Sequence, residues 1–597
     1  MTQQRLPEWA CTMREIFRAE TINQFLLTGN LNDLVLYEDE TAEKYYSLRH
    51  YLVEVLFQPF DVVIFYDRGK GIRLAKGAEF FFKYMKIFDR FHKTRFASDA
   101  NSALDMGKSL AAPGLLPKSA EQALEIIDRY IHAVANIGQT SSDAGIGKSC
   151  AVVVDYANFV APKGESLYMS GATSSNLIKI LNWAQDPEIS GSNIATLLLS
   201  QNLTDLHDLL VDNPYSAKIH IELPNSEEIL KYIEYLAAQE PDFKTYCPIA
   251  LGILAEKLTG LSKFNIKSII LRALRNKESI TMEYLTRLRR EIIEKEAFGK
   301  LDFIESDRTL DDVAGHTEAK KWLREDFQLI KKNVVNALPM GYLISGRIGT
   351  GKTFLVECFA GECKIPFVRL KNFREKWVGA TEGNLEKIFN ILHALGQVVV
   401  FVDEADQATG KRGGGDGDSG LSGRIYGMLA KEMSNTKNRG KIFWMFATSR
   451  PDMLEVDLKR QGRLDVHIPL FPPVEEQEIK DLFLAMARKL KLKLSPDDLP
   501  PLTFDQPVSG NEMEGLLVRA IREYELQEGE NKQSLPQLIA RVLEEFRPSA
   551  HTARLDLMDL LAVKECTDDR FLPPRFLDLD MMEVDRRIAQ LSLGASI

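Results

Sequence analysis

The chain has 597 residues, a length beyond which a single hydrophobic core stops growing, so we expect several domains. A composition of 45% hydrophobic and 27% charged residues is typical of a globular protein. The formal net charge of −10 disfavours sequence-independent nucleic-acid binding, which needs clustered Lys and Arg. We find neither a run of about 18 apolar residues nor a secretory signal, and therefore predict no membrane span. The six scattered cysteines predict free thiols in the cytoplasm.

The first half of the chain alternates short apolar runs with helical patterns. Strands are predicted for QFLLTG, DVVIFYD, CAVVVDYANFV, NIATLLLSQN and AKIHIELP. Helices are predicted for YYSLRHYLVEVLF, EQALEIIDRYIHAVAN and SNLIKILNWAQ. This alternation is typical of a parallel sheet covered by helices.

A stretch in the first half, SSDAGIGKSC from Ser141, contains the Gly-Lys-Ser that ends many phosphate-binding loops. A phosphate loop has the pattern G-x-x-x-x-G-K-[ST], with a strand before it and a helix after it. Here Ser142 stands five positions before Gly147, and the β-branched run after Ser149 predicts a strand. Lys148 would therefore enter a strand, and we interpret this stretch as a surface turn.

A second stretch, ISGRIGTGKTF from Ile344, satisfies both conditions. MGYLIS predicts a buried strand before it and TFLVECFAGE a helix after it. The loop's backbone N–H groups and the positive end of the helix favour phosphate. The residues expected to contact nucleotide are Gly346, Ile348, Gly349, Thr350, Gly351, Lys352, Thr353 and Phe354. This stretch predicts a nucleotide-binding site.

The apolar run QVVVFVDEAD, downstream of the loop, ends in a pair of carboxylates. Asp403 can hold Mg²⁺ together with the Thr353 hydroxyl. Glu404 can orient and activate a water molecule for attack on the γ-phosphate. The pair predicts an enzyme that hydrolyses ATP to ADP and phosphate with Mg²⁺.

The next predicted strand, IFWMFA, ends in the polar pair Thr448-Ser449, and the segment KRQGRLD follows. These features resemble sensor 1 and the second region of homology of the AAA clade of AAA+ ATPases, which contains katanin, NSF and the FtsH proteases. The resemblance implies that Arg460 reaches the γ-phosphate of a neighbouring subunit in a hexameric ring, with Arg463 as its companion. Family members usually carry Asn where Ser449 stands, which implies slower turnover here.

Two further segments resemble the same clade. TLDDVAGHTEAKKWLRE resembles the segment that abuts adenine, and the resemblance assigns this role to Val313 and Gly315. PVSGNEMEGLLVRA resembles the helical lid, with Gly510 near the ribose.

EKWVGATEGNLEKIF resembles the first pore loop of the clade, with Trp377, Val378 and Gly379 at its tip. In the family this aromatic residue grips a polypeptide in the central channel. Taken alone, Trp-Val-Gly could equally be part of a hydrophobic core, but its place between the second strand and Asp403 favours the pore loop.

The first half repeats the order of elements of the second without its catalytic residues. TGNLNDLV stands where the phosphate loop would be, and Asp155-Tyr156 replaces the two carboxylates. Counting back from IHIELP places the two arginine positions at Asn213 and Ser216. The chain therefore resembles the SpoVK-like group of bacterial and plastid tandem AAA proteins, in which a degenerate module precedes an active one.

We expect an α/β fold of two tandem AAA+ modules, each a parallel sheet flanked by helices with a small helical lid. The predicted domains are a degenerate α/β domain at 1–225, its lid at 226–300, an active α/β domain at 301–475, its lid at 476–545 and a C-terminal helical extension at 546–597. The expected function is Mg-ATP-dependent remodelling of a protein client by a ring with one active site per chain. The alternative is a slow ATP-dependent assembly switch or regulatory scaffold that does not thread its partner. A nucleic-acid motor is disfavoured by the charge balance.

Overall fold

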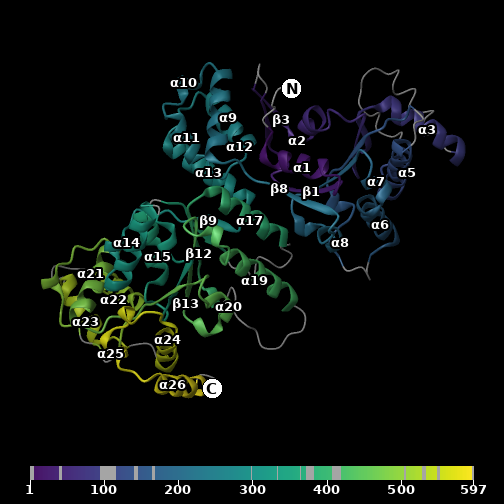
Figure 1. The fold of residues 1–597 in the computed structure, drawn as a ribbon. Helices are drawn as coiled ribbons and strands as arrows, with labels where there is room; N and C mark the ends of the chain where they lie inside the picture. The colour runs from purple at the N-terminus through teal and green to yellow at the C-terminus, as the bar shows by residue number, and fades with distance from the viewer. Residues whose placement is uncertain are drawn as a thin grey trace. The chain divides into compact units, whose positions relative to one another are not determined.

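The structure is a computed structural model that divides into two compact units, each described by itself. The units are Met1–Ile293 with Thr381–Ala394, and Glu294–Ala380 with Leu395–Ile597 (Figure 1). The structure describes residues 6–38, 43–93, 116–139, 145–164, 169–297, 299–332, 334–363, 365–371, 382–406, 419–502, 504, 506–527, 533–547 and 551–594.

The first unit is built on a six-stranded sheet with the order β5-β4-β6-β7-β1-β8. All neighbouring strands are parallel except the β4–β5 hairpin. The strands are β1 (Gln24–Gly29), β4 (Val62–Asp67), β5 (Gly71–Lys76), β6 (Cys150–Val154), β7 (Ile194–Leu199) and β8 (Ser216–Ile221).

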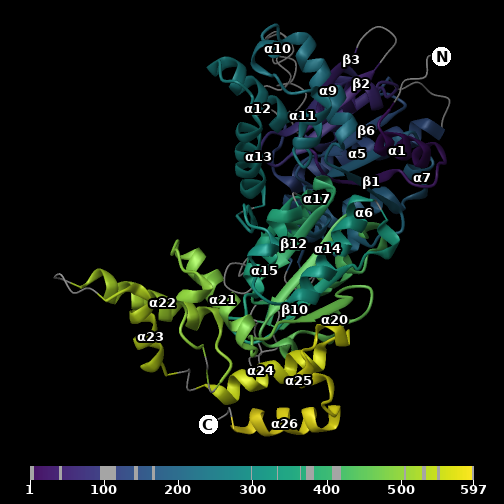
Figure 2. The same cartoon turned by 90° about the vertical axis from the view of Figure 1, so that its left-hand side faces the viewer.

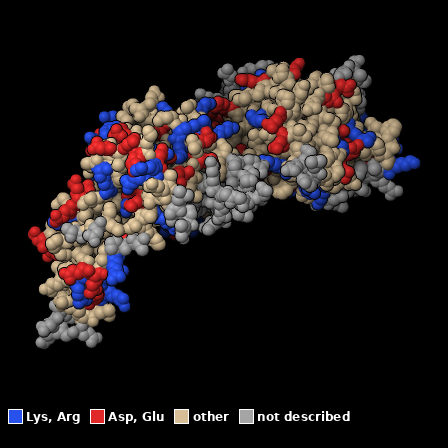
Figure 3. All heavy atoms as spheres, turned by 90° about the horizontal axis from the view of Figure 1, so that it is seen from below, with Lys and Arg blue, Asp and Glu red and all other residues tan. Residues whose placement is uncertain are grey.

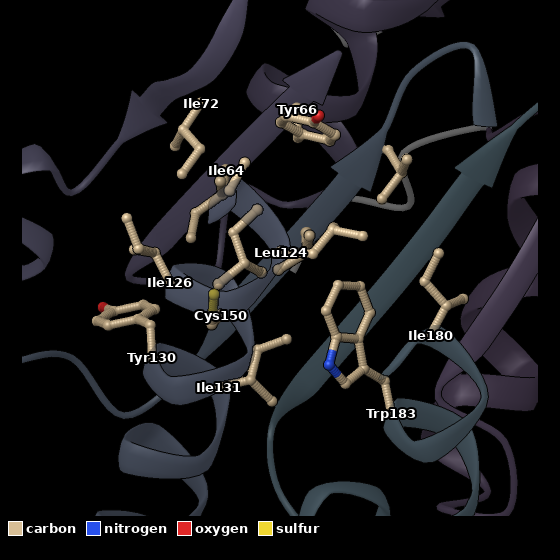
Figure 4. Close-up of a cluster of buried hydrophobic side chains, with 14 of the residues drawn as sticks. Ile64, Tyr66, Ile72, Leu124, Ile126, Tyr130, Ile131, Cys150, Ile180 and Trp183 are labelled. Carbon is tan, nitrogen blue, oxygen red and sulfur yellow. The ribbon is translucent and has the colours of Figure 1, made fainter. Parts of the chain in front are cut away.

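Helices cover both faces of this sheet, which explains why its strands read as continuous apolar runs. On β1, Leu26 joins one core, whereas Phe25 and Leu27 join the core on the opposite face. Figure 4 shows part of the first core, in which Tyr130 and Trp183 lie among the aliphatic side chains.

The main helices are α1 (Glu8–Arg18), α3 (Ala78–His92), α5 (Ala120–Gln139), α6 (Gly171–Gln185) and α8 (Asp208–Val211). A helical region follows, comprising α9 (Ser226–Gln239), α10 (Phe243–Tyr246), α11 (Leu251–Lys257), α12 (Lys263–Asn276) and α13 (Met282–Glu296).

The second unit contains a six-stranded sheet with the order β14-β10-β13-β12-β11-β9. Its strands are parallel except for the edge strand β9. Five strands of each sheet follow the same order along the chain and across the sheet, which confirms the predicted α/β fold with two similar modules. The strands are β9 (Leu301–Phe303), β10 (Gly341–Ser345), β11 (Phe367–Leu370), β12 (Val398–Val402), β13 (Ile442–Thr448) and β14 (Val466–Pro469).

The helices of the second unit fall into a core set, a lid and a C-terminal set (Figure 2). The core set includes α14 (Thr317–Lys331), α15 (Lys352–Cys363), α19 (Ser419–Met433) and α20 (Val456–Lys459). The helices of the segment predicted to be a lid, which keeps that name below, are α21 (Glu476–Lys489), α22 (Gly510–Glu525) and α23 (Leu535–Glu544). The C-terminal set comprises α24 (Thr552–Glu565), α25 (Pro574–Leu577) and α26 (Met581–Gly594). The helix α17 (Glu382–Leu395) falls almost wholly within Thr381–Ala394, the stretch that is grouped with the first unit. In the described ranges, no helix is both long and apolar enough to cross a membrane.

The prediction of one helix over YYSLRHYLVEVLF is partly wrong. Tyr45 and Tyr46 belong to strand β3 (Glu43–Ser47), which pairs with β2 (Leu34–Glu38). The helix α2 (Leu48–Tyr51) begins only after Ser47, whose hydroxyl caps it, and continues as a π-helical turn. The Tyr45 ring packs against two tyrosines of α9, with centroids 4.7 and 4.8 Å away. This packing overrides the local helical pattern. The edge strands β5 and β9 were also not predicted.

Candidate nucleotide-binding site

Three polar segments meet at the carboxyl ends of neighbouring strands in the second unit. Gly346 follows β10, Asp403 follows β12, and Ser449 follows β13, which lies between the other two strands. The register pairs Ser345 with Thr448, so the strands end at the same level. Ligands of open parallel sheets bind at this edge.

The phosphate loop runs from the end of β10 to the start of α15. Gly346 has a φ of 143°, and a Cβ atom there would lie 2.2 Å from the Leu470 carbonyl oxygen, so only glycine fits. A Cβ atom on Gly349 would lie 2.8 Å from that of Ser509 at the start of the lid helix α22. Since α15 begins at Lys352, its positive N-terminal end faces the loop, as phosphate binding requires.

Lys352 lies across the loop that it closes. Its ammonium donates to the carbonyl oxygens of Gly346 at 2.8 Å and Arg347 at 2.9 Å. Burial lowers the pKa of Lys352 to about 8, against the opposing effect of Asp403. Phosphate oxygens would favour its charged form.

We therefore predict that nucleotide affinity depends on pH through Lys352. Below a pH of about 8 the side chain is charged and ready for phosphate, whereas above this value binding must take up a proton. Binding of MgADP should therefore weaken above this pKa, with the dissociation constant rising by up to about tenfold per pH unit. Titration calorimetry at several pH values, in two buffers of different ionisation enthalpy, would measure both effects. A pH-independent constant without proton uptake would contradict this role.

The Thr353 hydroxyl and the Asp403 carboxylate lie together, 3.0 Å apart. A hydroxyl and a carboxylate suit Mg²⁺ that completes its octahedron with water and nucleotide phosphates. Among the described residues there is no group of three or more His, Cys, Asp or Glu that could hold a metal ion. The Thr353 hydroxyl and the Asp403 carboxylate are oxygen donors of the kind that Mg²⁺ prefers.

Glu404 is exposed beside this pair and has a left-handed backbone with a φ of 47°. Its N–H donates to an Asp403 carboxylate oxygen at 3.0 Å, which fixes the turn. Left-handed backbone is uncommon outside glycine, and such positions cluster at functional sites. Glu404 therefore faces solvent directly beside the Thr353–Asp403 pair.

A cavity of about 500 Å³ adjoins the loop and has the size of a small-molecule site. Val313, Gly315, Phe354 and Gly510, which the sequence predicts to contact nucleotide, are among the residues that line it. The Gly510 N–H donates to the Gly349 carbonyl at 3.2 Å and so links lid and loop. The sequence did not predict that residues of the C-terminal extension, 570–575, also line the cavity. Of the other phosphate-loop residues, the Thr350 side chain is buried and the Ile348 side chain is exposed.

Ser449 is half-buried directly after β13. Its neighbour Thr448 is fixed by a hydroxyl bond of 2.6 Å to Asp406, three residues after Asp403. The Arg450 N–H in turn donates to the Thr448 hydroxyl at 3.0 Å. Asp406 is a supporting residue that the sequence reading overlooked, although it ends the same Asp-Glu-Ala-Asp run.

The two arginines after α20 have different environments. The Arg463 side chain is buried, and its guanidinium binds the Asp457 carboxylate at 2.6 Å and the Asp457 carbonyl. The Arg460 side chain is 60% exposed and lies 3.2 Å from the same carboxylate. Arg463 therefore stabilises the loop, whereas Arg460 faces solvent. Trp377, Val378 and Gly379 of the predicted pore loop lie outside the described residues.

The first unit has a loop at the position equivalent to the phosphate loop. Gly29 ends β1 with a φ of 92°, and a Cβ atom there would lie 2.4 Å from the Ile221 carbonyl oxygen. A Cβ atom on Gly346 would meet the Leu470 carbonyl oxygen in the same way. The chain then enters strand β2 (Leu34–Glu38), not a helix. This loop therefore lacks both the lysine and the helix N-terminus that attract phosphate.

In the first unit, Asp155 stands at the position equivalent to Asp403, and it forms an ion pair with an arginine of the same chain. Tyr156 has the left-handed backbone of Glu404, with a φ of 53°, and follows Asp155 as Glu404 follows Asp403. The Arg49 guanidinium binds both Asp155 oxygens at 2.9 and 3.0 Å and the Leu31 carbonyl at 2.9 Å. An arginine of the chain thus occupies the side of Asp155 where a cation would bind.

A second carboxylate closes this loop against the helical region of the first unit. Asp33 accepts the N–H groups of Lys263 and Phe264, at 2.9 Å each, from the start of α12. The N-terminus of α12 is therefore already occupied by an anion of the chain.

The GIGKS stretch is a turn between α5 and β6, as predicted. The N–H groups of Lys148 and Ser149 donate to the Asp61 carboxylate at 2.8 and 3.2 Å. The Lys148 side chain is exposed, and the chain continues into β6.

The predicted arginine counterparts in the first unit need a correction. Gly29 lies against the Ile221 carbonyl as Gly346 lies against the Leu470 carbonyl, so Ile221 is the counterpart of Leu470. Arg460 and Arg463 stand ten and seven residues before Leu470. The same spacing before Ile221 gives Val211 and Pro214, not Asn213 and Ser216. The predicted positions are wrong because they are counted from the starts of the apolar runs IHIELP and VHIPL, and the strands β8 and β14 differ in length. Neither corrected position carries a cation.

The sheet edge, the glycine loop and the Thr353–Asp403 pair define a phosphate-loop nucleotide-binding module of the α/β class. Family models identify it further. Residues 342–471 match the ATPase family associated with various cellular activities, AAA. Residues 2–222 match the N-terminal Rossmann-like domain of AAA+ chaperones, and residues 227–298 match their second helical domain. All three matched segments therefore correspond to domains of AAA+ ATPases, and the AAA match supports ATP hydrolysis as the activity of the second module.

Several curated proteins are similar in sequence to this chain over part of their length. The chain is 33% identical over 198 residues to the ATP-dependent zinc metalloprotease FtsH 1 of Salinibacter ruber, covering 32% of this chain and 29% of the relative. It is 37% identical over 153 residues to the putative ribosome biogenesis ATPase nvl of Dictyostelium discoideum, covering 25% and 18%. It is 25% identical over 390 residues to the cell division cycle protein 48 homolog of Archaeoglobus fulgidus, covering 60% and 52%. The chain thus spans about half or less of these relatives.

Proposed function

We propose that this protein is an Mg-ATP-dependent remodeller of a protein client, with one active nucleotide site per chain. The observation that carries this proposal is the Thr353–Asp403 pair with Glu404 on the adjoining turn, beside a lysine-closed phosphate loop. The equivalent position of the first unit carries the Arg49–Asp155 ion pair instead. The second module would therefore hydrolyse ATP, and the first would serve as a scaffold, adaptor or regulator.

The roles of the residues follow from their positions. Lys352 and the loop N–H groups would bind the β- and γ-phosphates, while Thr353 and Asp403 would hold Mg²⁺, which neutralises charge on the transferred phosphoryl group. Glu404 would orient and deprotonate water, and Ser449 would align it. Val313, Gly315 and Gly510 would enclose adenine and ribose in the cavity.

Ring assembly is supported by Arg460, because its exposed guanidinium forms a surface pair with Asp457, and such pairs are weak enough to be exchanged for another partner. We propose a cytoplasmic hexamer of the SpoVK-like tandem type, in which Arg460 completes the site of a neighbour. The chaperone family models support a protein client, which Trp377, Val378 and Gly379 would grip.

A slow ATP-dependent assembly switch is the second candidate, and Ser449 favours it. Serine is shorter than asparagine and offers one hydroxyl, so it aligns water less firmly and would slow hydrolysis. Nucleic acid is a poorer candidate: on the face drawn in Figure 3, described Lys and Arg side chains are interspersed with Asp and Glu. A polyanion needs a continuous basic surface.

A trapping experiment separates these functions. Glu404→Gln should keep ATP affinity, because Asp403 and Thr353 remain, and should stop turnover, so that the ring stays closed on its client. We expect ATP-dependent co-purification of protein with this variant and none with Lys352→Ala. Nucleic acid in the trapped complex, or equal capture by both variants, would contradict the proposal. Turnover at the parental rate would place the water-activating role elsewhere.

A further inference from the structure

Arg347, the second residue of the phosphate loop, is tied to the C-terminal helix α24. Its guanidinium donates from Nε to an Asp559 oxygen at 2.9 Å and from Nη2 to the other oxygen. Both side chains are only 6% exposed. Asp556, one turn earlier, lies 3.5 Å from the same Nη2 but is 54% exposed. Helix α24 lies beyond the matched AAA segment.

The backbone of Arg347 organises the rest of the loop. Its carbonyl accepts the Thr350 hydroxyl at 2.9 Å and the Lys352 ammonium at 2.9 Å. A bidentate guanidinium–carboxylate pair fixes orientation as well as distance. Whatever holds Arg347 therefore also sets the positions of two side chains that border the phosphate site.

Helix α24 is itself firmly attached to the sheet. Leu557, Leu560 and Leu561 are buried. At its C-terminal end, the Glu565 carboxylate binds Lys459 and the Glu565 carbonyl lies 2.7 Å from Nδ1 of His467 in β14. The helix can therefore act as a fixed support for the loop.

We propose that Asp559 is a positioning residue of the ATP site, which holds the phosphate loop in its binding geometry through Arg347. This role rests on the proposed function, since it assumes that the loop binds nucleotide. An ordered loop binds phosphate without first losing conformational freedom, and small misplacements of such groups cost up to about 10²-fold. The C-terminal extension is then part of the ATP site.

The alternative is that the pair only stabilises the fold. A buried ion pair can often be replaced by apolar residues of similar volume without loss of stability. The double variant Arg347→Met with Asp559→Leu therefore separates the two roles. It removes the tie and leaves no unpaired buried charge.

The test is MgADP binding by calorimetry, with thermal unfolding, on the full chain. Asp559→Asn and the double variant should each weaken binding about tenfold or more, while Asp556→Asn should bind like the parent. The double variant should unfold at the parental temperature. Parental affinity in either Asp559 variant would overturn the inference. So would an equal loss in Asp556→Asn.

Lys352→Ala, measured in parallel, separates this inference from the proposed function. If Lys352→Ala loses MgADP while the Asp559 variants keep it, only the positioning role fails. If Lys352→Ala itself binds like the parent, the phosphate loop is not the nucleotide site and the proposed function fails.

Discussion

Replacing Arg460 with alanine is expected to lower ATP turnover by roughly 10³–10⁵-fold while nucleotide affinity stays nearly constant. Its guanidinium would stabilise the charge that develops on the γ-phosphate of a neighbouring subunit. The pair with Asp457 does not prevent this, because both side chains are about 60% exposed and such pairs contribute only about 0–1 kcal/mol. If Arg460 only formed this surface pair, its removal would leave turnover unchanged.

Mixing experiments test whether the site is shared between subunits. Lys352→Ala lacks a nucleotide site but still offers Arg460, and Arg460→Ala lacks the arginine but keeps the site. Each alone should be inactive, whereas mixed rings contain some complete interfaces and should recover activity. Parental turnover by isolated monomers at high dilution would rule out a shared site.

Replacing Lys352 with alanine is expected to abolish nucleotide binding, the second large effect. This lysine is the cation that closes the loop, and its Nζ already lies among the loop carbonyls. The matched control is Lys148→Ala, because Lys148 also follows Gly-x-Gly but belongs to the turn held by Asp61. Fluorescent-nucleotide titration of both variants should show loss only for Lys352→Ala. Loss with Lys148→Ala would contradict the interpretation of GIGKS.

Features set by neighbouring residues could be predicted from the sequence. The strands β10, β12 and β13 appear as apolar runs, and the phosphate loop has a fixed spacing between Gly346 and Lys352. The absence of a phosphate loop after β1 was equally evident, since TGNLNDLV contains no lysine.

Features set by distant partners could not be predicted. Asp559 lies 212 residues from Arg347, and Asp155 lies 106 residues from Arg49. No local spacing encodes such pairs. A carboxylate within the otherwise apolar run LMDLLAV around Asp559 was the only signal of a buried partner. The β2–β3 hairpin was missed for the same reason, because Tyr45 packs on α9.

Counting nucleotides per chain tests the central claim most directly, namely that the second module alone binds ATP while the first is closed by its own side chains. Equilibrium titration of the full chain with MgADP should give one site per chain. The result should not change in Arg49→Ala, where Asp155 is released but no lysine or loop helix is gained. A stoichiometry of two, or a site that persists in Lys352→Ala, would contradict the account.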